Sequence, residues 1–181
     1  MVEVRDRGFL SDLRGQRSSR TFPRDAFQEI EAAVRAVPPA IFGSGSSGAE
    51  IRQFDGFVAD GLREYEYEHA GDGGRNHVCK LWKEDGFDHS VDLYHPSRRI
   101  AIEIEKSERK RVSDDILKFI KGGKTQRENR KKIEFGCLIV PVNYRGSGDL
   151  FGSAMRTLEF MRSILFVEDV GVLGYVDPRW S

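Results

Sequence analysis

The chain has 181 residues, of which 39% are hydrophobic and 32% are charged, and its 29 basic residues balance its 29 acidic ones. This length is enough for one domain with a hydrophobic core, and the composition is typical of a globular protein. Because the net charge is zero, no overall basic signature points to nucleic acid, and any such signal must come from local segregation of charge.

Three further features of the sequence bear on where the protein works. No run of about 18 apolar residues occurs, so we expect no membrane span. Residues 1–15 lack the apolar core of a secretory signal. Cys79 and Cys137 both lie in apolar, strand-like runs, which predicts buried free thiols and therefore a cytoplasmic protein in a reducing environment.

The first third of the chain predicts a loose arm followed by two helices. Residues 1–20 hold five arginines and few large apolar side chains, so we expect a flexible basic arm that either contacts a polyanion or is simply solvated. Apolar residues at helical spacing then predict a helix that is entered at residues 22–25 and that Pro38 ends. A second helix is expected to begin at Ser47, because Ser47 and Glu50 fit a capping box.

The middle of the chain predicts a four-strand antiparallel meander. Its strands are expected at residues 64–68, 77–82, 91–94 and 99–106. The first strand alternates Glu with Tyr, and the last two strands are joined by a tight turn that contains Pro96.

Beyond residue 106 the apolar spacing changes to that of an amphipathic helix, with Val112, Ile116 and Phe119 on one face. A basic loop, the most apolar run of the chain, a helix and a short strand follow at residues 124–132, 133–142, 151–165 and 170–176. The apolar run predicts a buried central strand. Together the elements predict a single α/β domain over residues 1–181, with a central mixed β-sheet flanked by helices.

Acidic side chains gather in the last two strands of the expected meander. Because successive side chains of a strand point to opposite faces, Glu103 and Glu105 share one face, about 7 Å apart, and three isoleucines share the other. Asp92 lies eleven positions before Glu103, a separation that a hairpin brings together. Three converging carboxylates suit a hard cation such as Mg²⁺. The same alternation is also typical of an antiparallel strand with one solvated face.

The order of an Asp, a Glu-x-Glu strand, a helix and an apolar strand resembles the PD-(D/E)xK nuclease superfamily over roughly residues 48–142. The usual third residue of that motif is Lys, whereas this chain has Glu105 there, and Lys106, one position further, faces away from Glu103. The pattern is similar to the BamHI and BglII-like group of type II restriction endonucleases, in which Glu or Gln replaces the Lys. The resemblance implies a restriction-endonuclease-like core.

The resemblance also implies roles for individual residues. Asp92 and Glu103 would bind one or two Mg²⁺ ions beside the scissile phosphate, since metal ions supply both an activated water and charge neutralisation. Glu105, in the Lys position, would orient or deprotonate the attacking water, or share a second metal. Glu50 would add an outer-sphere contact, although its place in the capping box explains it at least as well.

Candidate DNA contacts come from the segments in which positive charge is concentrated. The basic loop and the N-terminal arm can neutralise phosphates, and Arg127, Asn129 and Arg130 carry groups that read guanine and adenine edges. The DNA-binding candidates are Lys124, Arg127, Asn129, Arg130, Lys131 and Arg145. Any one of them is equally a solvated surface charge, but a basic flank beside a carboxylate cluster on a neutral protein is more informative.

These inferences favour a Mg²⁺-dependent type II restriction endonuclease that hydrolyses double-stranded DNA at a short palindromic site. Since one such site cuts one strand, we expect a twofold homodimer, formed through residues 20–60 or through the last helix. Two alternatives stay open. One is a PD-(D/E)xK nuclease of repair or defence without palindrome specificity, and the other is a non-catalytic nucleic-acid-binding module with an acidic strand face.

Overall fold

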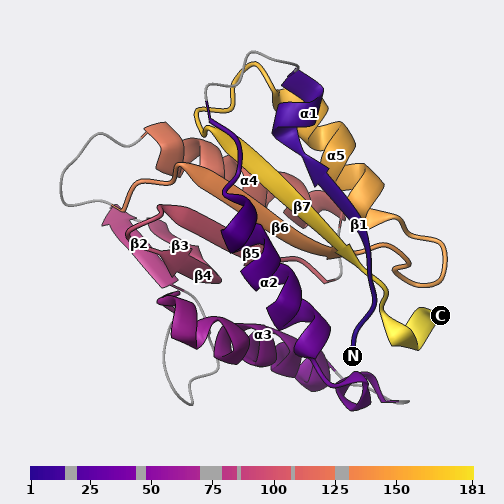
Figure 1. Cartoon of the computed structure of the whole chain (residues 1–181). Coiled ribbons are helices and arrows are strands. Elements are labelled where there is room, and N and C mark those ends of the chain that lie inside the picture. The colour runs from indigo at the N-terminus through magenta and orange to yellow at the C-terminus, as the bar shows by residue number, and fades with distance from the viewer. Residues whose placement is uncertain (15–19, 44–47, 70–78, 85–86, 107–108, 125–130) are drawn as a thin grey trace.

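The computed structural model describes residues 1–14, 20–43, 48–69, 79–84, 87–106, 109–124 and 131–181 (Figure 1). Its helices are α1 (Leu10–Arg14), α2 (Arg24–Ala36), α3 (Gly48–Leu62), α4 (Arg109–Lys124) and α5 (Leu150–Met161), with short 3₁₀ turns at Pro39–Phe42, Arg63–Tyr65 and Pro178–Trp180. Its strands are β1 (Val4–Phe9), β2 (Cys79–Glu84), β3 (Phe87–Val91), β4 (Leu93–His95), β5 (Ile100–Ile104), β6 (Phe135–Pro141) and β7 (Asp169–Tyr175).

Five of these strands form one mixed sheet in the order β1-β7-β6-β5-β4. The inner strands β5, β6 and β7 are parallel, and the edge strands β4 and β1 are antiparallel to their neighbours. Strand β6 is buried at every position and lies in the middle of the sheet, as its apolar sequence predicted. Strands β2 and β3 form a separate antiparallel hairpin.

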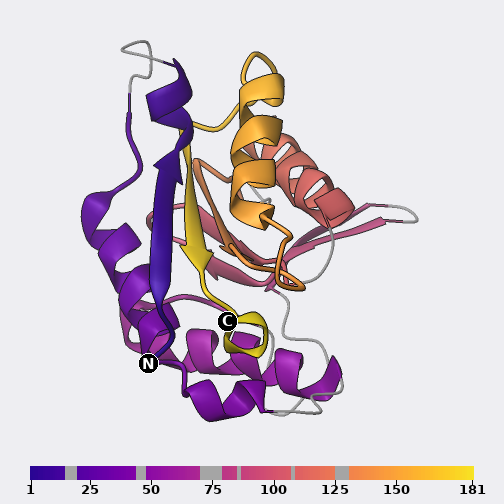
Figure 2. The same cartoon turned by 90° about the vertical axis from the view of Figure 1, so that its right-hand side faces the viewer.

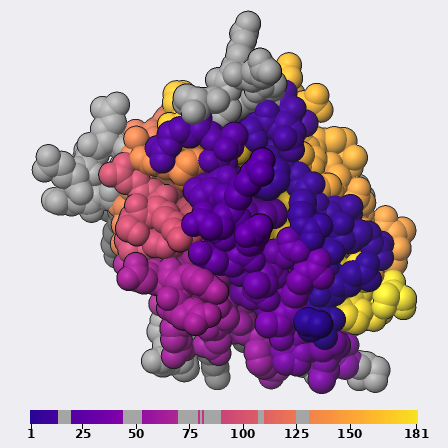
Figure 3. All heavy atoms as spheres, in the orientation of Figure 1, coloured from indigo at the N-terminus to yellow at the C-terminus, as the bar shows by residue number. Residues whose placement is uncertain are grey.

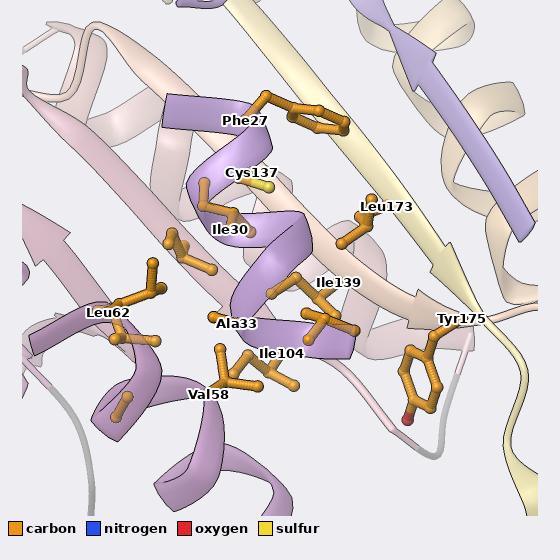
Figure 4. Close-up of a cluster of buried hydrophobic side chains, with 14 of the residues drawn as sticks. Phe27, Ile30, Ala33, Val58, Leu62, Ile104, Cys137, Ile139, Leu173 and Tyr175 are labelled. Carbon is orange, nitrogen blue, oxygen red and sulfur yellow. The ribbon is translucent and has the colours of Figure 1, made fainter. Parts of the chain in front are cut away.

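Helices cover both faces of the five-stranded sheet (Figure 2). Helices α2 and α3 pack on one face, where their apolar side chains meet the isoleucines of β5 in a first core (Figure 4). The space-filling view shows these two helices covering much of that face (Figure 3). Helices α4 and α5 pack on the opposite face, where Ala101 of β5 belongs to a second core. Strand alternation therefore directs Glu103 of β5 toward α4.

The expectation of a loose N-terminal arm is wrong for residues 1–14. Strand β1 pairs with β7 along its length, and Val2, Val4 and Leu10 are buried. The apolar side chains of this segment are few, but Val2 and Val4 join the first core and Leu10 joins the second, so they fasten the strand to the sheet edge from both faces. Arg7 pairs with Glu31 of α2 and is thereby held at the surface of the fold. Residues 15–19 lie outside the described part of the chain.

The expected four-strand meander is also corrected. Residues 63–65 form a 3₁₀ turn, Glu66 adopts a left-handed backbone conformation (φ 64°), and only an isolated bridge joins Glu68 to Tyr94. The alternation of Glu with Tyr in this segment therefore does not mark a strand. The remaining strands divide between two sheets, because β3 pairs with β2 whereas β4, one residue further along the chain, pairs with β5.

The other sequence predictions agree with the structure. Helices α2, α3, α4 and α5 and strands β6 and β7 lie where apolar spacing placed them, to within a few residues. Cys79 and Cys137 are buried and form no disulfide in the described part of the chain, as predicted. Within the described ranges, the structure contains no helix of the length and apolar character that a membrane crossing requires.

Candidate active site

Asp92 and Glu103 face each other across the β4–β5 pair. The antiparallel register sets Leu93 opposite Ile102, so the next pair outward is Asp92 and Glu103. Directly opposite residues of such a pair have Cβ atoms about 5 Å apart. The carboxylate of Asp92 also accepts a hydrogen bond from the backbone N–H of Ile104 at 2.7 Å. This bond fixes one Asp92 oxygen against the end of β5.

Helix α4 adds a lysine and a second acid to this pair. Lys118 donates to Glu103 Oε1 at 2.8 Å and to Asp115 Oδ1 at 3.0 Å. Glu103 is only 3% exposed and Asp115 only 7%. Asp115 and Lys118 stand one helical turn apart, which places both side chains on the side of α4 that faces β5.

Helix α3 contributes another acid from the other side of the sheet. Asp55 forms an ion pair with Lys106, which lies two residues beyond the end of β5. The Asp55 Oδ1 atom is buried and has no hydrogen-bond partner among the residues that the structure describes. A buried carboxylate oxygen without a partner is costly, so it marks a position where a further cation or donor would be stabilising.

Glu105 lies at the end of β5 and is 6% exposed. Its backbone N–H donates to the carbonyl of Ile139 at 3.1 Å, which continues the ladder between β5 and β6. Burial raises the pKa of both Asp55 and Asp115, and the nearby charge of Glu105 adds to it, so Glu105 lies between an acid of α3 and an acid of α4. Its catalytic role, like those of Asp92 and Glu103, stays a prediction.

Several acids lie close together in this site, and the pKa values of three of them are raised. Burial raises the pKa of Asp92 to about 6, and the nearby charge of Asp55 adds to the effect. Burial likewise raises the pKa of Asp115 to about 6 although Lys118 opposes it. The pKa of Glu103 is raised well above its ordinary value by burial and by the charges of Asp92 and Asp115. Such an arrangement favours protons or cations between the carboxylates.

The donor set can be tested against the metal that the fold family implies. Among the described residues, no three His, Cys, Asp or Glu side chains form a group that could hold a metal ion. Mg²⁺, however, commonly uses only one or two protein carboxylates, with waters and substrate phosphates completing its octahedron. Asp92 and Glu103 fit that smaller requirement, because each carboxylate has a second oxygen besides the one bonded to Ile104 or Lys118.

The predicted DNA contacts fall partly outside the described residues. Arg127, Asn129 and Arg130 lie there, and so does the side chain of Glu50, whose backbone belongs to the first turn of α3. The remaining candidates lie at three separate places. Lys124 ends α4 with its ammonium 4.1 Å from the centre of the Phe166 ring, Lys131 is ion-paired with Glu68, and Arg145 is exposed beside Tyr144.

Three residues of the site were missed in the sequence. Asp55 lies on the helix predicted from its capping box, Asp115 and Lys118 lie on the helix predicted from its apolar face, and the sequence assigned none of the three a role. An Asp and a Lys three positions apart on the helix that follows a Glu-x-Glu strand are a usable signal, because that helix must pack back onto the strand.

Comparison with known proteins identifies the family and the fold of the chain. A family described as "Putative halobacteria restriction endonuclease" matches residues 2–175. No curated protein matches the chain in sequence. The crystal structure of restriction endonuclease BglII complexed with a DNA 16-mer is similar in fold, with a TM-score of 0.62 and 12% identity over 96% of this chain and 78% of that one. The predicted α/β fold and the resemblance to type II restriction endonucleases are thus confirmed.

Proposed function

We propose, from the premise that the chain belongs to this halobacterial restriction endonuclease family, that it is a Mg²⁺-dependent, site-specific type II endonuclease. Family membership supports a restriction-type DNA nuclease. The metal, the specificity and the identity of the catalytic residues are the parts that we propose.

One observation carries the proposal. Asp92 and Glu103 lie opposite each other across the β4–β5 pair, Glu103 buried and Asp92 partly buried, in a fold similar to that of a restriction endonuclease. A structural role gives no reason for two buried acids to face each other, because their mutual repulsion destabilises the folded chain. A cation relieves that repulsion, and phosphodiester hydrolysis needs a cation at the phosphate.

In the proposed site, Asp92 and Glu103 hold the metal. A bound Mg²⁺ supplies a nucleophile made from water and neutralises charge that develops on the phosphate. The hydrogen bond from Ile104 to Asp92 fixes the direction of that carboxylate before substrate arrives. Glu105, in the place of the motif lysine, accepts the proton of the attacking water or orients that water.

DNA contacts and assembly complete the proposal. Lys124 and Arg145, both exposed, neutralise phosphates, and Arg127, Asn129 and Arg130 read base edges. Lys131 joins them by exchanging its pairing with Glu68 for a phosphate contact. A palindromic site cut on both strands requires two active sites, so the working enzyme is a homodimer whose twofold axis matches that of the DNA.

The test uses supercoiled plasmid and phage DNA incubated with the protein in Mg²⁺ or in EDTA. Discrete bands that form in Mg²⁺ and not in EDTA are the expected result, and sequencing their ends gives the recognition site. A metal-dependent smear identifies a nuclease without site specificity. Intact DNA that the protein retards in a gel identifies a binding module and contradicts the proposal.

A further inference from the structure

Lys118 stands out because it is the side chain that joins α4 to the acidic end of β5. Its ammonium contacts Glu103 and Asp115 together, at 2.8 and 3.0 Å. Its side chain is 31% exposed, whereas those of Glu103 and Asp115 are 4% and 10% exposed. The Lys118 side chain therefore reaches solvent where the two acids that it contacts do not, so it is the member of this cluster that an anionic substrate meets most readily.

The other lysine near the end of β5 is engaged elsewhere. Lys106, next to the motif position that Glu105 occupies, is ion-paired with Asp55 of α3 and is only 16% exposed. Glu103, by contrast, points toward α4. Lys106 therefore does not supply positive charge to Glu103, and this charge comes from Lys118.

We propose that Lys118 is a catalytic residue of this site, a lysine delivered by α4 that contacts the scissile phosphate during cleavage. The inference rests on the proposed nuclease function and deepens it. A lysine ammonium has three N–H donors, and in the described part of the chain Lys118 uses two of them, on Glu103 and Asp115. The third donor is available to a phosphate oxygen beside Glu103.

The charges of the site explain why such a lysine is needed. A phosphate that reaches Asp92 and Glu103 enters a region already crowded with carboxylates, and repulsion opposes its approach. A compact ammonium offsets that repulsion and also favours the additional charge that develops in the transition state. Without DNA the same ammonium stabilises the ionised forms of Glu103 and Asp115, so a metal ion competes with it for Glu103.

The test compares K118M, which keeps the length of the side chain and removes its charge, with K121M on the same helix. Lys121 is exposed and lies one turn further along α4. Single-turnover cleavage in Mg²⁺ is expected to slow at least about 100-fold in K118M, and to stay within about threefold of the unmodified chain in K121M. DNA affinity measured in Ca²⁺ is expected to change little in either variant.

A second measurement does not depend on cleavage. Calorimetric titration with Mn²⁺ in the absence of DNA is expected to show about tenfold tighter binding in K118M, because the ion no longer competes with the ammonium for Glu103. K121M is expected to bind Mn²⁺ as the unmodified chain does. Unchanged or weaker binding in K118M contradicts the proposed competition.

The double variant D115N/K118M separates catalysis from charge balance, and it removes both members of a buried ion pair in case K118M alone folds poorly. If Lys118 only balances Asp115, the double variant will cleave as fast as D115N, and the proposal is overturned. If Lys118 contacts the phosphate, the double variant will stay as slow as K118M. Cleavage by K118M at the unmodified rate overturns only the role of Lys118, whereas absence of cleavage by the unmodified chain overturns the proposed function as well.

Discussion

Two groups of buried carboxylates in this fold differ in what surrounds them. At the start of β7, Asp169 is fully buried and accepts backbone N–H hydrogen bonds from Ser11, Phe22 and Val170 at 2.8 to 2.9 Å. At the end of β5, Asp92 accepts a hydrogen bond from one backbone N–H. Glu103 accepts its hydrogen bond from the long side chain of Lys118 rather than from the backbone. Asp169 and Glu103 are both removed from water, but only Asp169 is surrounded by fixed donors.

We interpret the difference as that between a structural acid and a candidate functional one. Fixed backbone donors satisfy a buried carboxylate without any outside partner, so Asp169 fastens α1 and the segment before α2 to the sheet. Acids that instead face one another raise each other's pKa and favour the binding of a cation between them. Under the proposed function, the acids at the end of β5 give up stability for metal binding.

The largest effect on stability is expected from replacing Asp169, which accepts hydrogen bonds from three backbone N–H groups. Asp169→Ala leaves three backbone N–H groups without an acceptor, and we expect it to lower the free energy of unfolding by about 3 kcal/mol or more. Asp149→Ala, which removes an exposed N-cap bonded to Gly152, is the matched control and should lower it by about 1 kcal/mol. Urea unfolding measures both, and equal losses would remove the distinction between Asp169 and an ordinary cap.

A smaller effect is expected from pH, with opposite signs for the acids at the end of β5 and for an acid paired with arginine. Asp92 and Asp115 have folded-state pKa values raised from 3.8 to about 6, so the folded chain keeps protons that the unfolded chain has lost. Their contribution to stability is therefore present below pH 3.8 and is lost as the pH rises through about 6. For Asp92 alone this loss is at most about 3 kcal/mol.

The measurement is urea unfolding in EDTA at intervals between about pH 4 and pH 7. Asp92→Asn is expected to flatten the fall in stability with rising pH. Glu31→Gln is a control of opposite sign, because the hydrogen bond from Arg7 lowers the pKa of Glu31, and its contribution is lost as the pH falls. A steeper fall in the Asp92 variant would show that the sign assigned to the β5 end is wrong.

The smallest effect is expected from exposed charges away from the acids. Lys124→Ala should weaken DNA binding by less than about tenfold for every sequence, and reduce the slope of log K against log salt by about 1. The unchanged recognition of sequence follows because a phosphate contact carries no base information. Binding of the cognate and of an unrelated duplex at several salt concentrations measures this, and a loss confined to the cognate duplex would assign Lys124 to base reading instead.

Much of the fold could be predicted because local pattern and tertiary environment agree. Strand β6 is apolar throughout and is buried on both faces, and the apolar stripe of α2 packs where its spacing indicated. Prediction failed where pairing partners are distant in sequence. Strand β1 is formed by pairing with β7, which lies at the other end of the chain. Residues 64–68 alternate as a strand would, but in the described part of the chain they pair with another strand only at the bridge between Glu68 and Tyr94.

The site could be predicted only as far as the hairpin reaches. The spacing of Asp92 and Glu103 determines their register once the β4–β5 turn forms, so sequence reasoning paired them correctly. Helix packing brings Asp55, Asp115 and Lys118 to the site. This packing does not depend on a particular number of residues between the helices and the hairpin, so no spacing in the sequence indicates it. Helical spacing indicated which residues of α4 share a face, but it did not reveal that the strand packed against that face carries Glu103.

The central claim is that the acids at the end of β5 are needed for DNA cleavage. The substitution Glu103→Gln tests it most directly. The variant keeps the size of the side chain and removes its charge. Its plasmid cleavage in Mg²⁺, compared with that of the unmodified chain at equal folded concentration, is expected to fall at least about 1,000-fold, equivalent to about 4 kcal/mol of transition-state stabilisation. DNA binding in Ca²⁺ should persist. Cleavage by the Gln variant at the rate of the unmodified chain would contradict the account.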